Sequence, residues 1–274
     1  MVSSIARMLE TTPHWLAPRE ACEFVGEFEK EILSSLLRDL RGDGEYDVIV
    51  LPDHNRQKKM LIADMDSTII TIECIDELAD FMGIKSEVAA ITNRAMAGEL
   101  NFIDALRERV ALLAGLKVSV IHEVCRERVE LTPGARCLVQ TMRASGAVTA
   151  LVSGGFAQFT EYVADLAGFQ YHVANRLETK GGVLTGHVDE PIRDSSAKLQ
   201  TLLQISMNYG LKPQDILAVG DGANDLEMIK EAGIGCAYRA HAILRTNADI
   251  EINNTALTTA LFAQGIERSS FAVN

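Results

Sequence analysis

Three short apolar runs, with helical patterns between them, indicate an α/β fold. The runs are residues 60–63, 147–152 and 216–220. Short apolar runs bounded by Gly or Asp are typical of the buried central strands of a parallel sheet, and helices between them indicate βαβ units. The runs end at Asp64, Ser153 and Asp221. Because ligands of such sheets bind beyond the carboxyl ends of the strands, we expect these three residues to converge there.

A long insertion between the first two runs, residues 72–131, has apolar residues at helical spacing throughout. Four helices are expected, over residues 75–81, 87–96, 102–113 and 118–129. Asn101 is expected to cap the third of them. Four amphipathic helices in succession predict a small helical cap over the edge of the sheet.

The remaining chain divides into a catalytic core and an N-terminal unit. The core is expected to comprise residues 58–71 and 132–274, and to contain a strand pair within 171–188 that turns at Lys180-Gly181-Gly182. Residues 1–57 are expected to form a small separate α+β unit of unclear role. Its helical patterns lie around residues 19–40, and a strand is expected at 46–50.

Charge and cysteine usage narrow the possible partners. The chain has 26 Lys and Arg against 38 Asp and Glu, a net charge of −12. An acidic chain is a poor candidate for broad binding to nucleic acid or to anionic membranes. A small phosphorylated substrate is still compatible, because one local cation can dominate a pocket. Five scattered cysteines without a CxxC pair, and no apolar segment of signal-peptide or membrane-spanning type, lead us to expect a cytoplasmic protein.

Two acidic motifs follow the first and the third apolar run. At 64–68 (DMDST) a loop could turn both carboxylates towards one substrate, one attacking in its ionised form and one donating a proton to the leaving group. At 220–225 (GDGAND) the acids Asp221 and Asp225 are hard oxygen ligands that suit Mg²⁺. A solvated loop with two acids, or a Gly-Asp turn before a helix, would give the same local patterns.

Two further elements could contact a phosphate group. Ser153-Gly154-Gly155 combines a hydroxyl with free backbone amides, which together can form an anion site. Lys198 stands near the start of an expected helix, from which its ammonium could reach a phosphate. Taken singly, these features are better explained by a tight glycine turn and a surface lysine.

The order of the four elements resembles the haloacid dehalogenase superfamily of phosphotransferases, from about residue 58 onward. The DxDST and GDGxND signatures are specific to its phosphatase branch. Within it the chain is most similar to the phosphoserine phosphatases. That similarity is carried by Glu73 and by residues 75–77 (IDE), 95–102 (AMAGELNF), 106–110 (LRERV), 152–156 (VSGGF), 174–177 (ANRL) and 184–186 (LTG).

This resemblance implies an α/β fold with a Rossmannoid core, a mostly parallel sheet and a helical-bundle (C1-type) cap inserted after the first core strand. It also implies Mg²⁺-dependent hydrolysis of O-phosphoserine through an aspartyl-phosphate, the last step of serine biosynthesis. The implied catalytic and metal-site roles are Asp64 as nucleophile and Mg²⁺ ligand, Asp66 as general acid/base and ligand through its carbonyl, Asp221 as second carboxylate ligand, and Lys198 on the phosphoryl group, with Asp225 in support. The implied substrate contacts are Ser153, Gly154 and Asn224 near the phosphate, Glu73 for the ammonium, Arg109 for the carboxylate, and Met96 with Phe102 as pocket walls.

Alternatives to this activity stay open at this point. Another small-molecule phosphatase, or a phosphotransferase to an alcohol such as homoserine, would use the same scaffold. A non-catalytic phospho-ligand sensor is a third possibility. Residues 239–241 (RAH) depart from the Lys-Pro pair of many relatives, and we expect a turn of little consequence there. Spacing alone would also allow Arg109 to point to solvent, as part of the charged run 107–109.

Overall fold

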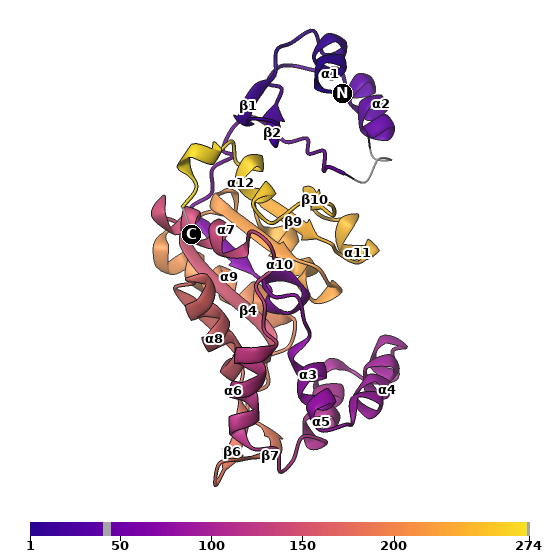
Figure 1. The fold of residues 1–274 in the computed structure, drawn as a ribbon, viewed down its shortest axis with the longest axis vertical. Coiled ribbons are helices and arrows are strands. Elements are labelled where there is room, and N and C mark those ends of the chain that lie inside the picture. Colours follow the sequence, from indigo (N-terminus) through magenta and orange to yellow (C-terminus); the bar gives the residue numbers. More distant parts are fainter. Residues whose placement is uncertain (41–44, 273–274) are drawn as a thin grey trace.

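The computed structural model describes residues 1–40 and 45–272, except for the side chain of Met96. Its centre is a six-stranded sheet in the order β10-β9-β8-β3-β4-β5, in which every neighbouring pair is parallel (Figure 1). These strands are β3 (Met60–Ala63), β4 (Val148–Phe156), β5 (Tyr171–Asn175), β8 (Ile216–Gly220), β9 (Ile234–Tyr238) and β10 (Ile250–Ile252). The three apolar runs of the sequence are therefore the adjacent strands β8, β3 and β4 at the centre of the sheet.

Helices cover both faces of this sheet, because alternate residues of each strand point to opposite sides. Leu61 and Ala63 of β3 pack in one buried cluster, and Met60 and Ile62 in the other. The first face is covered by α7 (Ala135–Ala144), α8 (Ala157–Ala167) and α12 (Thr259–Ala263), and the second by α9 (Ser196–Tyr209), α10 (Leu226–Glu231) and α11 (Ala242–Arg245). With both faces covered, near-continuous apolar strands are what a parallel sheet requires.

The insertion after β3 forms the expected helical cap. It contains α3 (Cys74–Phe81), α4 (Lys85–Met96), α5 (Phe102–Ala111) and α6 (Val118–Glu127), which lie beyond one end of the sheet in Figure 1. The side chain of Asn101 caps α5 as predicted, since its Oδ1 accepts a hydrogen bond from the amide of Asp104 at 2.9 Å. An isolated bridge between Ile70 and Leu131 closes the neck where the cap leaves and rejoins the core.

A two-stranded hairpin of the core reaches towards the cap. It consists of β6 (Leu177–Lys180) and β7 (Val183–Val188), antiparallel, with the turn at the predicted glycines. The expectation of one strand pair over 171–188 was incomplete, because β5 pairs with β4 at the edge of the main sheet instead. Alternation within 171–175 does not distinguish a hairpin partner from an edge strand.

The N-terminal part lies at the opposite end of the molecule from the cap (Figure 1). It contains α1 (Val2–Met8), a hairpin of β1 (His14–Ala17) and β2 (Ala21–Glu23), and α2 (Lys30–Leu40). The prediction of helix over residues 19–40 was therefore wrong where β2 lies. The predicted strand at residues 46–50 is not formed. The division at residue 57 stays a prediction, but buried Leu16 and Ala17 belong to the same apolar cluster as the core.

One carboxylate fastens residues 46–51 to the core. Asp47 accepts hydrogen bonds from the backbone amides of Asn253, Asn254 and Thr255 at 2.9, 3.2 and 3.0 Å. Ile49 and Leu51 pack against the larger buried cluster nearby. This stretch is thus attached to the loop between β10 and α12, far from the cap.

Candidate active site

The loop after β3 turns two carboxylates into one cleft. The amide of Asp64 donates to the carbonyl of Val219 at 3.0 Å, which continues the pairing of β3 with β8 by one residue. The backbone then reverses through Ser67, whose φ of 55° is in the left-handed region. Such a φ is uncommon outside glycine and marks a tight, locally determined turn. As a result Asp64 and Asp66 both line the same cleft.

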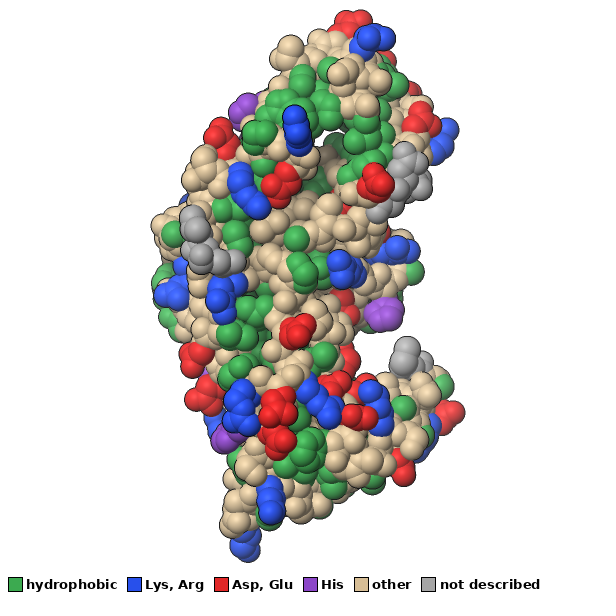
Figure 2. Space-filling model, in the orientation of Figure 1, with side chains coloured by type: hydrophobic (Ala, Val, Ile, Leu, Met, Phe, Trp, Pro, Cys, Tyr) green, Lys and Arg blue, Asp and Glu red, His purple; other side chains and the backbone are tan. Residues whose placement is uncertain are grey.

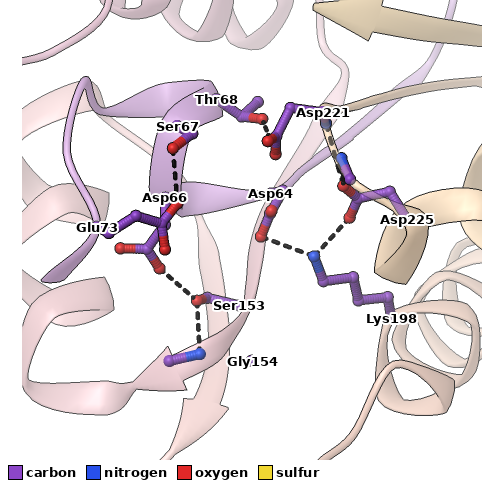
Figure 3. A network of polar contacts seen from close by, with 12 residues as sticks. Asp64, Asp66, Ser67, Thr68, Glu73, Ser153, Gly154, Lys198, Asp221 and Asp225 are labelled. Atoms are coloured by element: carbon purple, nitrogen blue, oxygen red, sulfur yellow. Dashed lines mark hydrogen bonds and ion pairs between the residues drawn. The ribbon is translucent and has the colours of Figure 1, made fainter. Parts of the chain in front are cut away.

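A buried lysine connects the first and third apolar strands (Figure 3). Lys198, on the first turn of α9, is only 2% exposed, and its Nζ lies 2.8 Å from Asp64 and 2.5 Å from Asp225. Burial opposes its charge, but the two carboxylates outweigh burial and raise the pKa of the ammonium above its usual range. Lys198 is therefore a fixed cation in the site and not the surface lysine that its local sequence alone favoured.

Asp225 organises the loop after β8. One of its oxygens contacts Lys198, and the other accepts from the amides of Asp221 and Gly222 at 3.1 and 3.0 Å. Gly220 makes this possible, since a Cβ there would lie 2.4 Å from the Asp225 carboxyl carbon. Asp225 is completely buried and fully engaged, and it holds Asp221 at the rim.

Three acids here could hold a metal ion. Ligand oxygens of Asp64, Asp221 and Asp225 all lie within 4.8 Å of one another. Burial raises the pKa of both Asp64 and Asp221, Asp225 raises both further, and Lys198 opposes the shift in each case. One ammonium thus faces several acids, so the site has too little positive charge to balance its carboxylates. Hard carboxylate oxygens suit a divalent cation such as Mg²⁺, so the donor set fits. Asp64 and Asp221 are the better ligands, because Asp225 is already engaged.

The loop after the second apolar run contacts Asp66 (Figure 3). Ser153 Oγ donates to Asp66 Oδ2 at 3.1 Å and accepts from the amide of Gly155 at 2.8 Å. The other Asp66 oxygen accepts from the amide of Cys74 at 2.9 Å. Burial raises the pKa of Asp66, although these donors work against the shift. The strand pairing is irregular between Val152 and Phe156, and such bulges are frequent beside active sites.

The cleft between core and cap has a volume of about 500 Å³ and is visible as a hollow at one edge of the molecule (Figure 2). Its cap side includes Glu73, Phe102 and Arg109. The ring of Phe102 lies against the loop at residues 153–155, 3.3 Å from where a Cβ on Gly154 would stand. Core and cap are therefore in contact across the cleft entrance.

Glu73 and Arg109 place opposite charges at the cap end of the cleft. Glu73 Oε1 accepts from Ser67 Oγ at 2.6 Å, and burial followed by the charge of Asp66 raises its pKa to about 7. Arg109 is half-buried, and its Nε donates to the carbonyl of Ala105 at 3.2 Å. It lines the cleft, whereas its neighbours Arg107 and Glu108 are exposed.

The structure thus brings the predicted site residues together from distant parts of the chain. The cleft is lined by Asp64, Asp66, Glu73, Phe102, Arg109, Ser153, Gly154, Asp221 and Asn224, while Lys198 and Asp225 lie buried behind Asp64. The side chain of Met96 lies outside the described residues, so its expected wall position is untested.

Sequence analysis gave no individual role to Thr68, beside the cleft, or to His241 and Ile243, which line it. Thr68 donates from Oγ1 to Asp221 Oδ1 at 3.1 Å and so links the first motif to the last. His241 and Ile243 line the cleft, and the amide of His241 donates to the carbonyl of Asp221 at 2.9 Å. The segment 239–241 had been expected to be of little consequence. Its departure from the Lys-Pro pair of relatives was the signal that could have drawn attention to it.

Comparisons with known proteins agree with this site. A model of haloacid dehalogenase-like hydrolases matches residues 61–230. A phosphoserine phosphatase of Archaeoglobus fulgidus is 39% identical over 240 residues, 86% of this chain and 70% of that protein. A phosphoserine phosphatase of Polaromonas sp. strain JS666 is 47% identical over 208 residues, 74% of this chain and 88% of that protein. The match to the Archaeoglobus fulgidus protein covers 86% of our chain, which is more than residues 58–274 alone could supply. The similarity therefore extends into the N-terminal part.

A solved structure is similar over the same region. It is a phospho-aspartyl intermediate analogue of phosphoserine phosphatase, with a TM-score of 0.69, 40% identity, and coverage of 75% of this chain and 98% of that one. In the described part of our chain, no helix combines the length and the apolar content needed to cross a membrane. The chain belongs to the haloacid dehalogenase-like hydrolase family, and its relatives within that family are phosphoserine phosphatases.

Proposed function

We propose that this chain hydrolyses O-phosphoserine to serine and phosphate, with Asp64 as the nucleophile. The observation that carries the proposal is the pairing of buried Lys198 with Asp64 at 2.8 Å, beside a cleft that Glu73 and Arg109 also line. The pair of Lys198 and Asp64 suits a phosphoryl group, and the charges of Glu73 and Arg109 suit an amino acid. The named relatives are phosphoserine phosphatases, which supports the same substrate.

In the first step, an Asp64 oxygen attacks phosphorus in line with the serine oxygen. A bond forms between Asp64 and phosphorus while the bond from phosphorus to serine breaks. Lys198 neutralises charge on the phosphoryl oxygens, and Ser153 and the amides of its loop donate hydrogen bonds to them. Asp66 starts protonated, as its raised pKa favours, and gives its proton to the departing serine oxygen.

In the second step, Asp66 acts as a base. Now ionised, it takes a proton from a water molecule, which attacks the phosphorus of the aspartyl-phosphate. The bond between phosphorus and Asp64 breaks, phosphate leaves, and both carboxyls return to their starting states. Contact between Phe102 and the loop at residues 153–155 closes the cleft entrance and limits the access of other water.

Mg²⁺ is the cofactor that we propose. Asp64 and Asp221 would supply carboxylate ligands and Asp66 its backbone carbonyl, with Asp225 in a supporting place. When bound, the ion supplies positive charge that keeps Asp64 ionised and offsets charge on the phosphoryl oxygens. The raised pKa values of Asp64 and Asp221 express the same need for a cation.

Recognition of the amino acid belongs to the cap side. Glu73 would contact the substrate ammonium and Arg109 its carboxylate, the latter through a bidentate pair that suits guanidinium geometry. Phe102 would pack on the substrate at the entrance, while Ser153, Gly154 and Asn224 would surround the phosphoryl group. The five cysteines are free thiols, in keeping with a proposed cytoplasmic location.

The test is phosphate release from a panel of phosphomonoesters, in Mg²⁺ and in EDTA. O-phosphoserine should be the best substrate, and EDTA should abolish turnover. Phosphoethanolamine, which lacks the carboxylate, and 3-phosphooxypropionate, which lacks the ammonium, should both be poorer. If the two truncated esters are turned over as well as phosphoserine, the substrate assignment is wrong. If added homoserine increases the release of serine and itself becomes phosphorylated, the chain is instead a phosphotransferase.

A further inference from the structure

The hairpin β6–β7, a part of the core, is bonded to the cap by its backbone. Leu184 donates to the carbonyl of Leu116 at 2.8 Å and accepts from the amide of Gly115 at 2.9 Å. The amide of Val118 donates to the carbonyl of Gly182 at 3.0 Å. The loop between α5 and α6 therefore adds a short third strand to the hairpin, through the bridge between Lys117 and Val183.

Side chains seal the same contact. Leu177 and Leu184 of the hairpin are 2% exposed and share one apolar cluster with Val110 and Leu113, at and just beyond the C-terminal end of α5. The neck at Ile70 and Leu131 and this hairpin are thus two of the places at which the cap contacts the core.

The closest approach is at Gly186. A Cβ built there would lie 3.0 Å from the Ala114 Cβ and 3.3 Å from the Ala111 carbonyl oxygen. Its φ is +85°. Gly182 in the same hairpin has a φ of +82°, but a Cβ there would meet nothing within 4 Å. The two glycines have the same backbone requirement, and only Gly186 touches the end of α5.

The helix held in this way is the one that carries the cap wall of the cleft. Phe102, Leu106 and Arg109 all lie on α5 and line the cleft. Arg109 stands two residues before Ala111, where α5 ends against the hairpin. A shift of the hairpin would therefore move the guanidinium before it moved the phosphate site, which is built from core loops.

We propose that the β6–β7 hairpin positions α5 for substrate recognition, and that Gly186 is the specificity-positioning residue at their contact. The inference rests on the proposed function, in which Arg109 contacts the substrate carboxylate. It adds that Arg109 is aimed by a core element that is distant from it in sequence. Displacing a recognition group by about 1 Å can cost on the order of a hundredfold, so a small shift at this contact is sufficient.

The decisive comparison is Gly186→Ala against Gly182→Ala in the full chain. Gly186→Ala should lower kcat/KM for phosphoserine roughly ten- to hundredfold, mainly through KM, and change turnover of phosphoethanolamine by less than about threefold. Gly182→Ala carries the same positive-φ penalty and should leave the ratio of the two substrates unchanged. The double variant Gly186→Ala/Ala114→Gly removes the nearest clashing atom and should restore much of the preference.

Equal losses on both substrates in Gly186→Ala, or an equal change of preference in Gly182→Ala, would overturn the proposal. If Gly186→Ala does not fold, Ala114→Val tests the same contact from the cap side with no backbone penalty, and it should also lower the preference. Hydrogen exchange adds a readout that is independent of activity, since the amides of Gly115 and Val118 should exchange faster in Gly186→Ala. A wild type with no preference for phosphoserine would refute the proposed function, yet the exchange result would still report on the contact.

Discussion

The two walls of the cleft are built in different ways. On the core wall, Lys198 and Asp225 are buried and bonded on several sides. Lys198 stands on the first turn of α9, and Asp225 follows the paired strand β8. On the cap wall, Arg109 is half-buried and its Nε donates a hydrogen bond to its own helix, and Phe102 is 36% exposed. The core wall is held by an ion-pair network, and the cap wall by the packing of one helix.

This difference separates chemistry from recognition. Phosphoryl transfer needs groups that are fixed before substrate arrives, because preorganised charges stabilise a transition state without reorganising. Recognition of serine needs only charges that match the ammonium and carboxylate of a small molecule, which side chains of the cap can supply. Changes on the core wall should therefore lower turnover whether or not an ester carries the serine ammonium and carboxylate, whereas changes on the cap wall should affect phosphoserine selectively.

The largest effect is expected for Asp64→Asn on the core wall. Without the nucleophile, phosphate release should fall roughly 10⁴-fold or more for every substrate. Circular dichroism and thermal unfolding should show that the near-isosteric variant is folded. Turnover close to wild type in a folded variant would exclude the covalent route.

The next effect is expected for Asp66→Asn. Losing the acid and base should slow the reaction ~100- to 10,000-fold. The loss should be smaller for p-nitrophenyl phosphate, whose leaving group needs no proton. A uniform loss across leaving groups of different pKa, in steady-state and single-turnover kinetics, would remove Asp66 from the role of acid.

A smaller and selective effect is expected for Arg109→Ala on the cap wall. A charge-assisted hydrogen bond contributes about 1.5–3 kcal/mol, so kcat/KM for phosphoserine should fall about ten- to hundredfold. Phosphoethanolamine should be almost unaffected. Arg126→Ala is the matched control, because Arg126 is an exposed arginine of the cap whose ion-pair partner, Glu127 at 3.7 Å, is its neighbour on α6. The same change of preference in both variants would show that Arg109 does not contact the carboxylate.

The smallest effect is a pH dependence that belongs to Glu73. Its pKa is raised from 4.5 to about 7, so the carboxylate that should bind the ammonium becomes neutral as pH falls through about 7. Because kcat/KM reports the free enzyme, the ratio of phosphoserine to 3-phosphooxypropionate should decrease up to about tenfold per pH unit below that value. Titration of Asp66 and of the phosphate cancels in the ratio. In Glu73→Gln the ratio should be low and flat with pH, and a slope that persists there would assign the titration to another group.

The core wall could be predicted from sequence in large part because its residues follow apolar runs. Strands β3 and β8 have the bounds expected from the sequence, and parallel pairing then brings Asp64 and Asp221 to one edge. The position of Arg109 in the cleft could not be derived from spacing, which alone favoured an orientation towards solvent. The packing of α5 between the cleft and the hairpin determines that Arg109 lies in the cleft. Thr68 was missed because its partner, Asp221, lies far away in the sequence. His241 was missed because it contacts Asp221 through backbone atoms.

Local pattern also failed where a strand needs a partner. Residues 46–50 have the composition of a strand, yet they form none with the residues that the structure describes, and Asp47 attaches them through side-chain hydrogen bonds. Residues 171–175 are the reverse case, since they resembled a hairpin arm and became the edge of the main sheet. Which strands meet is a property of the whole fold, and periodicity alone does not contain it.

The Asp47 attachment has a practical consequence for anyone who shortens the protein. A truncated version that starts at residue 58, the boundary suggested by composition, would remove the acceptor for three main-chain donors and uncover the apolar surface beneath Ile49 and Leu51. Such a product invites aggregation during expression, whatever its catalytic competence. A truncation that begins at Tyr46 keeps the contacts of Asp47, Ile49 and Leu51 with the core. It is therefore the better starting point for a minimal enzyme.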